Sequence, residues 1–439
     1  MLAYQLRIAA NSLRRTPVLS ALLVAGIALG VAVATTFVTT FHVMASDPIP
    51  GKSRQLFYVQ VDNWTPDRPW DRDRPEEPPD QLSWREVQNL LASDLPARQA
   101  ASFKANLTVH PESREERPFR ALTRVTRPDF FEMFEVPFLY GGPWDAAAEA
   151  ARSPVVVLGE ATNRRLFGGD DSVGRTVRIE DRPFTVLGVV APWAPRPKFY
   201  DVTNGALQDP EELYVPLSLT LEMEIRSAGN TSNWKPWDGE FADFLESESV
   251  WLQMWVELPT AQARQEYEDF LAAYVHEQQQ VGRLTRPVNN RLRDVREWMT
   301  VSEVVPPEAK TMLIIGLLFL LVCSINLIGI LLGKFLGRAP EVGVRRALGA
   351  SRGSVFAQHL VECEVVALLG GAVGLALSTV TLRVLNRLFT EGAERELFTL
   401  DLTMLGAGVA LALAAGIVAG AYPAWRICRV APATYLKQQ

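Results

Sequence analysis

The segment RAPEVGVRRALGAS, residues 338–351, has the residue spacing with the clearest chemical meaning in this sequence. Glu341 and Arg345 stand four positions apart with the acid first, the order that favours an ion pair along a helix. Arg346 places a second cation beside Arg345. A short helix with a basic face and an apolar face suits binding to a membrane surface or to a groove in a partner protein.

The same segment predicts a short helix of about two turns. Pro340 supplies the fixed φ that suits a first helical turn, and Gly349 suits the left-handed residue that ends a helix. Val344, Ala347 and Leu348 form an apolar ridge at i, i+3, i+4 spacing on another side from the arginines. A helix this short is not stable alone in water, so it must dock on another surface.

Other chemistry is missing from the sequence. The stretch SDPIPGKS, residues 46–53, ends like a phosphate-binding loop, but Ser46 stands where the first glycine belongs and two prolines offer no N–H group. The four histidines are scattered, and no H-E-x-x-H motif occurs. We therefore predict that this chain has no catalytic residue and binds no metal, nucleotide or other cofactor.

Four apolar stretches are long enough to cross a bilayer, for which about 20 residues are needed. They cover residues 18–45, 312–333, 361–385 and 402–425. The first is longer than the apolar core of a secretory signal, which is about 7 to 15 residues, so we interpret it as an uncleaved anchor. The sequence thus predicts an integral membrane protein of four transmembrane helices.

Basic residues near the ends of these stretches set the predicted orientation. Residues 1–17, the loop 334–356 and the tail 426–439 carry most of them and are predicted to lie in the cytoplasm. Residues 46–305 hold 29 Lys and Arg against 42 Asp and Glu, and the loop 386–401 is also acidic. Both are predicted on the opposite side. The basic residues lie beside the apolar stretches, where membrane topology and contact with anionic lipid explain them. No nucleic acid partner is therefore predicted.

The insertion between the first two stretches reads as a soluble α+β domain. Residues 55–63 and 250–258 alternate like strands, and the second strand is apolar enough for both faces to be covered. Ser83 and Thr260 precede helical patterns and are predicted N-caps. A division near residues 110–115 and again near 245 would leave one sub-domain interrupted by another.

Polar residues inside the apolar stretches are the remaining candidates for function. Thr35, Thr36, Thr39 and Thr40 recur at helical spacing near the outer end of the first stretch. Hydroxyl residues in spans most often mark close helix–helix contact, so we interpret them as a dimer seam, with a substrate path as the alternative. Glu362, near the inner end of the third stretch, can reach headgroups or basic neighbours.

Several of these segments resemble one known family. Residues 326–378, which include the opening segment, are similar to the second-to-third-span region of the MacB/FtsX-type permeases of ABC transporters. Residues 419–437 resemble the end of their last span and tail, and residues 125–144 and 155–193 are similar to the periplasmic core of MacB-like permeases. The motifs occur in the right order over nearly the whole chain.

The resemblance implies a fold of four spans with a large periplasmic domain in the inner membrane of a bacterium. Within that domain it implies a porter-like part, residues 46–112 and 246–305, and a sabre-like part, residues 113–245. It also implies a dimer, formed with an identical or a paralogous permease, on two copies of a cytoplasmic ATPase that binds ATP and Mg. MacB itself carries its ATPase on the same chain, so here we expect a separate subunit.

The family also assigns the opening segment as the coupling helix to the ATPase. Its E-x-G-x-R-R-x-x-G pattern matches Glu341, Gly343, Arg345, Arg346 and Gly349. The candidate coupling residues are therefore Pro340, Glu341, Gly343, Val344, Arg345, Arg346, Leu348 and Gly349. This sequence departs just upstream, where relatives usually have a Thr-Arg pair and it has Ala339 and Pro340, which affects the details of docking.

The function that the resemblance implies is ATP-driven extrusion of peptide, antibiotic or lipid-linked cargo by transmitted motion, with a periplasmic adaptor and an outer-membrane duct as further partners. Two alternatives stay open at this point. One is an FtsX-like signalling subunit that activates a periplasmic cell-wall hydrolase, and the other is a permease that extracts lipoproteins. The large insertion favours extrusion over signalling.

Overall fold

The computed structural model describes residues 12–112, 117–389 and 398–429, and they divide into two compact units. One unit, the membrane unit, contains residues 12–45 and 305–429, and the other, the inserted domain, contains residues 46–304. Parts of the segments expected at 1–17, 386–401 and 426–439 lie outside the described residues.

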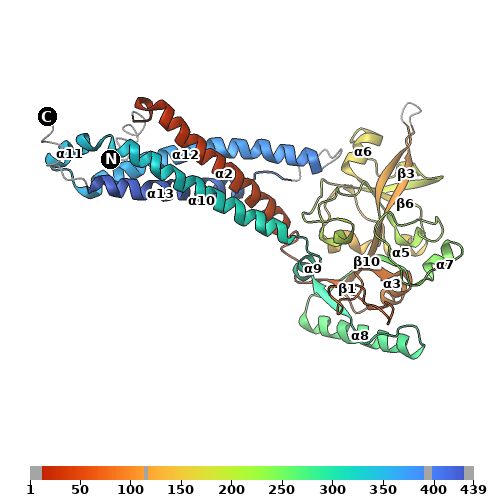
Figure 1. The fold of residues 1–439 in the computed structure, drawn as a ribbon. Helices are drawn as coiled ribbons and strands as arrows, with labels where there is room; N and C mark the ends of the chain where they lie inside the picture. The colour runs from red at the N-terminus through yellow and green to blue at the C-terminus, as the bar shows by residue number, and fades with distance from the viewer. Residues whose placement is uncertain (1–11, 113–116, 390–397, 430–439) are drawn as a thin grey trace. The chain divides into compact units, whose positions relative to one another are not determined.

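The membrane unit consists of four long apolar helices and one short helix. The long helices are α2 (Pro17–Ala45), α10 (Pro307–Leu336), α12 (Arg352–Phe389) and α13 (Leu402–Cys428), and the short helix is α11 (Ala339–Ala347). Each long helix contains a window apolar enough to cross a membrane. They pack side by side, with α2, α10 and α13 all in contact with one another and α12 against α2 and α13 (Figure 1). The predicted fold of four transmembrane helices is confirmed.

Small residues allow these helices to approach closely. A Cβ atom at Gly374 of α12 would lie 2.7 Å from the backbone oxygen of Ala28 in α2. A Cβ at Gly416 of α13 would lie 2.6 Å from Cβ of Ala367 in α12. Such backbone contact is typical of membrane helices, whose association depends on packing because lipid removes the hydrophobic driving force. The helix α12 is therefore held tightly between α2 and α13.

The inserted domain is built on one sheet of eleven strands. The strands are β1 (Leu56–Gln60), β2 (Leu82–Ser83), β3 (Arg98–His110), β4 (Phe119–Thr126), β5 (Phe138–Gly141), β6 (Val155–Gly159), β7 (Thr176–Ile179), β8 (Arg182–Val190), β9 (Leu213–Pro216), β10 (Val250–Glu257) and β11 (Arg291–Asp294). The helices are α3 (Trp84–Leu91), α4 (Asp129–Met133), α5 (Ala146–Ala150), α6 (Glu160–Phe167), α7 (Phe241–Leu245), α8 (Ala261–Gln280) and α9 (Val295–Val301), with 3-10 turns η1 (Phe199–Asn204) and η2 (Leu217–Leu219).

The sheet runs in the order β11-β1-β10-β3-β4-β9-β6-β8-β5, with β2 beside β10 and β7 beside β3 and β8. Every residue of β10 is buried, so both faces of this strand are covered, as the sequence predicts. On one face Trp251 packs with Phe103, and on the other Trp255 packs with Tyr58. The domain therefore has a hydrophobic core on each side of its sheet.

The sheet crosses the place where a division into sub-domains is predicted. Strand β3 precedes residue 113 and β4 follows it, yet the two pair over a long register from Ser102 opposite Thr126 to Val109 opposite Phe119. Strand β10, which follows residue 246, pairs with β3 as well. The division into a porter-like and a sabre-like part stays a prediction. Strands from both parts pair with each other in one sheet.

A cluster of buried charges fastens the segment 198–211 to the sheet. Arg124 of β4 is fully buried and makes ion pairs with Asp201 and with Glu211, whose Oε1 lies 2.6 Å from Nη2 of the arginine. Lys198 Nζ lies 2.8 Å from the same Oε1, and the hydroxyl of Tyr200 donates to Oε2 over 2.7 Å. Two cations thus face two carboxylates out of contact with water.

This cluster sets the ionisation of Glu211. Burial raises the pKa of the Glu211 carboxyl, but the charges of Lys198 and Arg124 outweigh burial and lower it from 4.5 to about 2. The carboxylate is therefore ionised at any physiological pH.

Candidate functional site

The short helix α11 occupies the connection between the transmembrane helices α10 and α12. Arg338 is its N-cap residue, and Pro340 lies in its first turn, where the missing N–H group costs no hydrogen bond. Gly349 has φ +100, and the N–H groups of Gly349 and Ala350 donate to the carbonyls of Arg346 and Arg345. This is the glycine-dependent Schellman ending, so the predicted stop at Gly349 is observed.

One face of α11 is anchored on the membrane unit and the other is exposed. Ala339, Val342 and Gly343 are buried, and α11 packs on α13. On the exposed side the side chain of Val344 is 48% accessible and that of Leu348 is 84% accessible. Ala347 is also exposed, so the whole apolar ridge that the sequence singles out faces away from the chain's own core.

The two arginines of α11 have different partners. Arg345 Nη2 lies 2.7 Å from Glu341 Oε1, which is the predicted i,i+4 ion pair, and its Nη1 donates to Gln358 Oε1 of α12 over 3.2 Å. Arg346 Nη1 donates to the backbone oxygen of Cys428 at the end of α13 over 3.0 Å. The arginines therefore also tie α11 to the two neighbouring helices, which the sequence pattern does not reveal.

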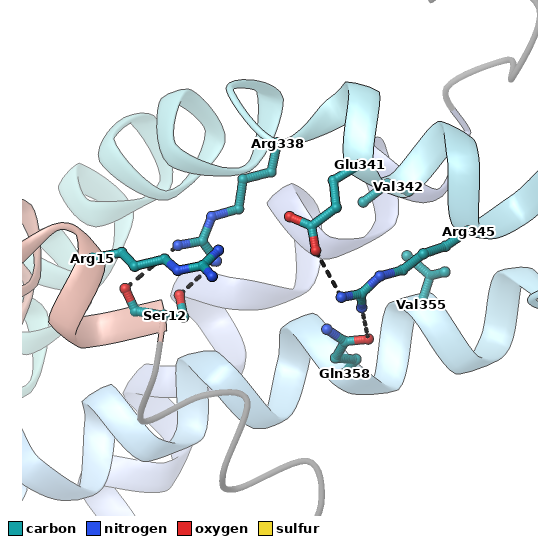
Figure 2. Close-up of a pocket in the computed structure, with 8 residues that line it drawn as sticks. All are labelled: Ser12, Arg15, Arg338, Glu341, Val342, Arg345, Val355 and Gln358. Carbon is teal, nitrogen blue, oxygen red and sulfur yellow. Dashed lines mark hydrogen bonds and ion pairs between the residues drawn. The ribbon is translucent and has the colours of Figure 1, made fainter. Parts of the chain in front are cut away.

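A pocket lies beside the anchored face of α11 (Figure 2). It is lined by Ser12, Arg15, Arg338, Glu341, Val342, Arg345, Val355 and Gln358. The polar groups in it pair with one another: Arg345 with Glu341 and Gln358, and Arg338 with Ser12, whose Oγ accepts a hydrogen bond over 2.6 Å. At this pocket, the segment that precedes α2 lies next to the start of α11 and next to α12.

A buried ion cluster lies next to this pocket. Glu362 of α12 is 2% accessible, and its Oε1 lies 2.8 Å from Lys334 Nζ in the last turn of α10. The contact is an ion pair by distance and does not meet hydrogen-bond geometry. Ser12 donates a hydrogen bond to the same Oε1. An acid inside one apolar stretch and a base directly after another are the signal in the sequence, but their pairing depends on the fold.

Three of the four threonines of α2 lie inside the bundle, and Thr40 is half-buried. Thr35, Thr36 and Thr39 are buried, and Thr36 Oγ1 lies 3.2 Å from Ser378 Oγ of α12. Thr36 and Thr40 also donate to the carbonyl one turn earlier in their own helix, over 2.7 and 3.0 Å. The dimer seam stays a prediction, and within this chain Thr36 already contacts α12.

Among residues 12–112, 117–389 and 398–429, no group of three or more His, Cys, Asp or Glu side chains is arranged to hold a metal ion. Cys363 and Cys428 are buried in the membrane unit and Cys323 is half-buried there. The site defined by α11 consists of an exposed apolar ridge on a helix that two arginines tie to α12 and α13.

Two family models match this chain over adjoining regions. The MacB-like periplasmic core domain matches residues 20–274, which is more than half of the chain, and the FtsX-like permease C-terminal model matches residues 313–432. The second match includes α11, Lys334 and Glu362.

Curated relatives agree with these models. The macrolide export ATP-binding/permease protein MacB of Syntrophobacter fumaroxidans is 26% identical over 72% of this chain and 47% of its own length. The protein of the same name from Azoarcus sp. is 25% identical over 81% of this chain and 47% of its own length. This chain thus spans about half the length of the curated relatives it matches.

Among solved structures, the periplasmic region of MacB from Actinobacillus actinomycetemcomitans is similar, with 13% identity, a TM-score of 0.37, and coverage of 59% of this chain and 96% of that one. The family assignment rests on the two models, which match the inserted domain and the helices that follow it. Together with four transmembrane helices, these matches identify a membrane permease with a periplasmic-type domain. The chain belongs to the MacB/FtsX-type family of ABC transporter permeases.

Proposed function

We propose that α11 is the coupling helix of this permease, through which a separate cytoplasmic ATPase drives the inserted domain on the other side of a bacterial inner membrane. The observation that carries this proposal is the division of α11 into an anchored face and an exposed apolar ridge. Val344 and Leu348 are accessible although they are apolar, and the helix that carries them is held in place by Arg345 and Arg346. Such a ridge is suited to burial in a groove of a partner.

The connections of α11 explain how a push on it would travel. Only Gly337 and Arg338 separate it from α10, and only residues 348–351 separate it from α12. A displacement of α11 must therefore move the ends of both transmembrane helices. At its other end α10 continues into the segment 293–310, which contains α9 and leads into the inserted domain. In this proposal the segment relays the motion.

The partners follow from the same proposal. ATP and Mg bind to the ATPase, present in two copies, and not to this chain. A second permease, identical or paralogous, completes the complex, with an adaptor and an outer-membrane duct as further partners. The relatives are named for macrolide export, which supports an amphipathic cargo such as an antibiotic, a peptide or a lipid-linked compound. The extent of the inserted domain, residues 46–304, supports extrusion over signalling.

Purification of the tagged chain from native membranes tests the proposal. We expect an ABC ATPase to co-purify with the wild type, and Leu348→Asp to lower its recovery about tenfold or more, because losing an interface hot spot costs about 2 kcal/mol or more. Leu95→Asp is the matched control, since Leu95 is an exposed leucine of the inserted domain, 45% accessible. Equal recovery of ATPase with Leu348→Asp and wild type would remove α11 as the docking site.

A further inference from the structure

The carboxylate of Glu362 is the meeting point of three separate segments of the membrane unit. Ser12, which precedes α2, donates a hydrogen bond to Oε1, and Lys334 of α10 places its amine 2.8 Å from the same atom. Glu362 itself belongs to α12. All three side chains are buried, so water does not screen these contacts.

Two further groups complete the surroundings of this carboxylate. Arg338 Nη1 lies 3.6 Å from Oε1 and donates to Ser12 Oγ over 2.6 Å, so the Ser12 hydroxyl accepts from the arginine and donates to the glutamate. His359 Nδ1 lies 3.8 Å from Oε2. Cations therefore face Glu362 from α10 and from the α10–α11 connection, and an imidazole ring lies near it on its own helix. We call Glu362, Ser12, Lys334 and Arg338 the Glu362 clamp.

The clamp joins the helices that lead to the inserted domain. Helix α2 begins at Pro17, five residues after Ser12, and ends at Ala45, directly before the domain, and α10 begins at Pro307, directly after it, and contains Lys334. The chain thus enters and leaves the domain through two helices, and Glu362 contacts the segment that leads into the first helix and the last turn of the second. Helix α11 lies between the two other clamp segments, α10 and α12.

We propose that Glu362 is a positioning residue that fastens the start of α2 and the end of α10 to α12, so that a displacement of α11 moves both helices leading into the inserted domain together. The clamp follows from the contacts alone, whereas its use in transmitting motion rests on the proposed function of α11. Without the carboxylate, Lys334 and Arg338 would repel each other at the point where α2 and α10 meet, because a buried charge that loses its partner is strongly unfavourable.

The chain offers a matched control two residues further along α12. Glu364 is also a carboxylate in the apolar part of the bundle, and a Cβ at Gly416 of α13 would lie 2.9 Å from its Oε1. Both oxygens of Glu364 are buried and have no hydrogen-bond partner among the described residues. Glu364→Gln changes the same chemical group on the same helix without touching the clamp.

The test measures whether the ends of α2 and α10 move as one body. Spin labels at Val18 and Leu336, which are 73% and 41% accessible, report their separation in the full chain, in lipid nanodiscs with its co-purified ATPase, by pulsed electron spin resonance. In the wild type we expect one narrow distance distribution that does not change when ATP and vanadate are added. In Glu362→Gln we expect the distribution to broaden and to shift with nucleotide, and in Glu364→Gln to stay as in the wild type.

Two milder variants keep the test decisive if Glu362→Gln does not insert. Ser12→Ala removes only the hydroxyl that links the start of α2, so it should broaden the distribution while the Lys334–Glu362 pair is retained. Glu362→Asp keeps the charge and should restore part of the narrow distribution. Wild-type distributions in both Glu362→Gln and Ser12→Ala, or equal broadening in Glu364→Gln, would overturn the clamp.

A label at Ala347, which is exposed beside Leu348, separates this inference from the proposed function and leaves Leu348 in place. It should lose mobility when the ATPase binds, because α11 is then covered. If the Ala347 label does not respond to the ATPase while the Val18–Leu336 distribution still depends on Glu362, the coupling role of α11 fails and the clamp stands. If the Ala347 label responds and the distribution is independent of Glu362, the clamp fails and the coupling role stands.

Discussion

Replacing both Arg345 and Arg346 by glutamate is expected to reduce substrate-stimulated ATP hydrolysis to the unstimulated level while the chain stays inserted in the membrane. At Arg345 the change places a second carboxylate four residues after Glu341 and removes the hydrogen bond to Gln358. At Arg346 it removes the hydrogen bond to the Cys428 carbonyl. It also reverses the charge in the last turn of α11, where the helix dipole favours cations. The double variant therefore loses the hydrogen bonds that tie α11 to α12 and α13, and the positive charge at the end of α11 becomes negative.

The measurement is ATP hydrolysis by the purified complex in nanodiscs, with carbonate extraction of membranes to confirm insertion. Arg14→Glu is the control, because Arg14 is an exposed arginine that precedes α2 and does not line the pocket at α11. We expect that control to hydrolyse ATP as the wild type does. Normal stimulation in the double variant would show that α11 does not couple the two proteins.

The second large effect is expected in the inserted domain, where Arg124→Met should lower the free energy of unfolding by about 3 to 5 kcal/mol. The substitution leaves Asp201 and Glu211 buried with one fewer cation between them, and only Lys198 still faces Glu211. A side chain of similar length fills most of the space, so the effect reports the charge.

Denaturant unfolding of the full chain in nanodiscs, followed by tryptophan fluorescence, measures this change. All tryptophans except Trp425 lie in the inserted domain, so the signal is specific to it. Arg178→Met is the control, since Arg178 and Asp181 form an exposed pair 3.4 Å apart whose loss should cost less than about 1 kcal/mol. An equal effect of the two substitutions would contradict a special contribution from the buried cluster.

The same cluster predicts a dependence of stability on pH. The folded pKa of Glu211, about 2, lies below its ordinary value of 4.5. The stabilisation from its ionised form is therefore fully present above pH 4.5 and is lost as the pH falls toward 2. The destabilisation caused by Arg124→Met should accordingly be largest near neutral pH and shrink in that acid range.

Features that depend on local sequence could be predicted from the sequence. Ser83 caps α3 in a capping box with Glu86, and Thr260 caps α8 by accepting from the Ala263 N–H group, because a cap needs only residues within one turn. The four spans were predictable for a similar reason, since hydropathy accumulates along one continuous stretch. The Glu341–Arg345 pair and the stop at Gly349 are local in the same sense.

Features that depend on distant contacts could not be predicted. The pattern in α11 shows an apolar ridge but not which face the chain itself buries, because that depends on Val342 and Gly343 meeting the rest of the membrane unit. Thr36 is a hydroxyl residue of the kind expected where helices of two subunits meet, yet its partner in this structure is Ser378, far along the same chain. Likewise Glu362 is visible as a charge in a span, while its contact with Ser12 follows only from the packing of four helices.

The central claim is that α11 and the inserted domain lie on opposite sides of one membrane and are joined by its helices. Labelling of intact cells with a membrane-impermeant maleimide tests it directly, on single cysteines placed at Ser354, in the first turn of α12 after α11, and at Val281 of the domain, because both residues are exposed and neither lies on the α11 ridge. The account predicts that the cysteine at Val281 reacts in intact cells and the one at Ser354 reacts only after the inner membrane is permeabilised. Reaction of both positions in intact cells, or protection of both, would contradict it.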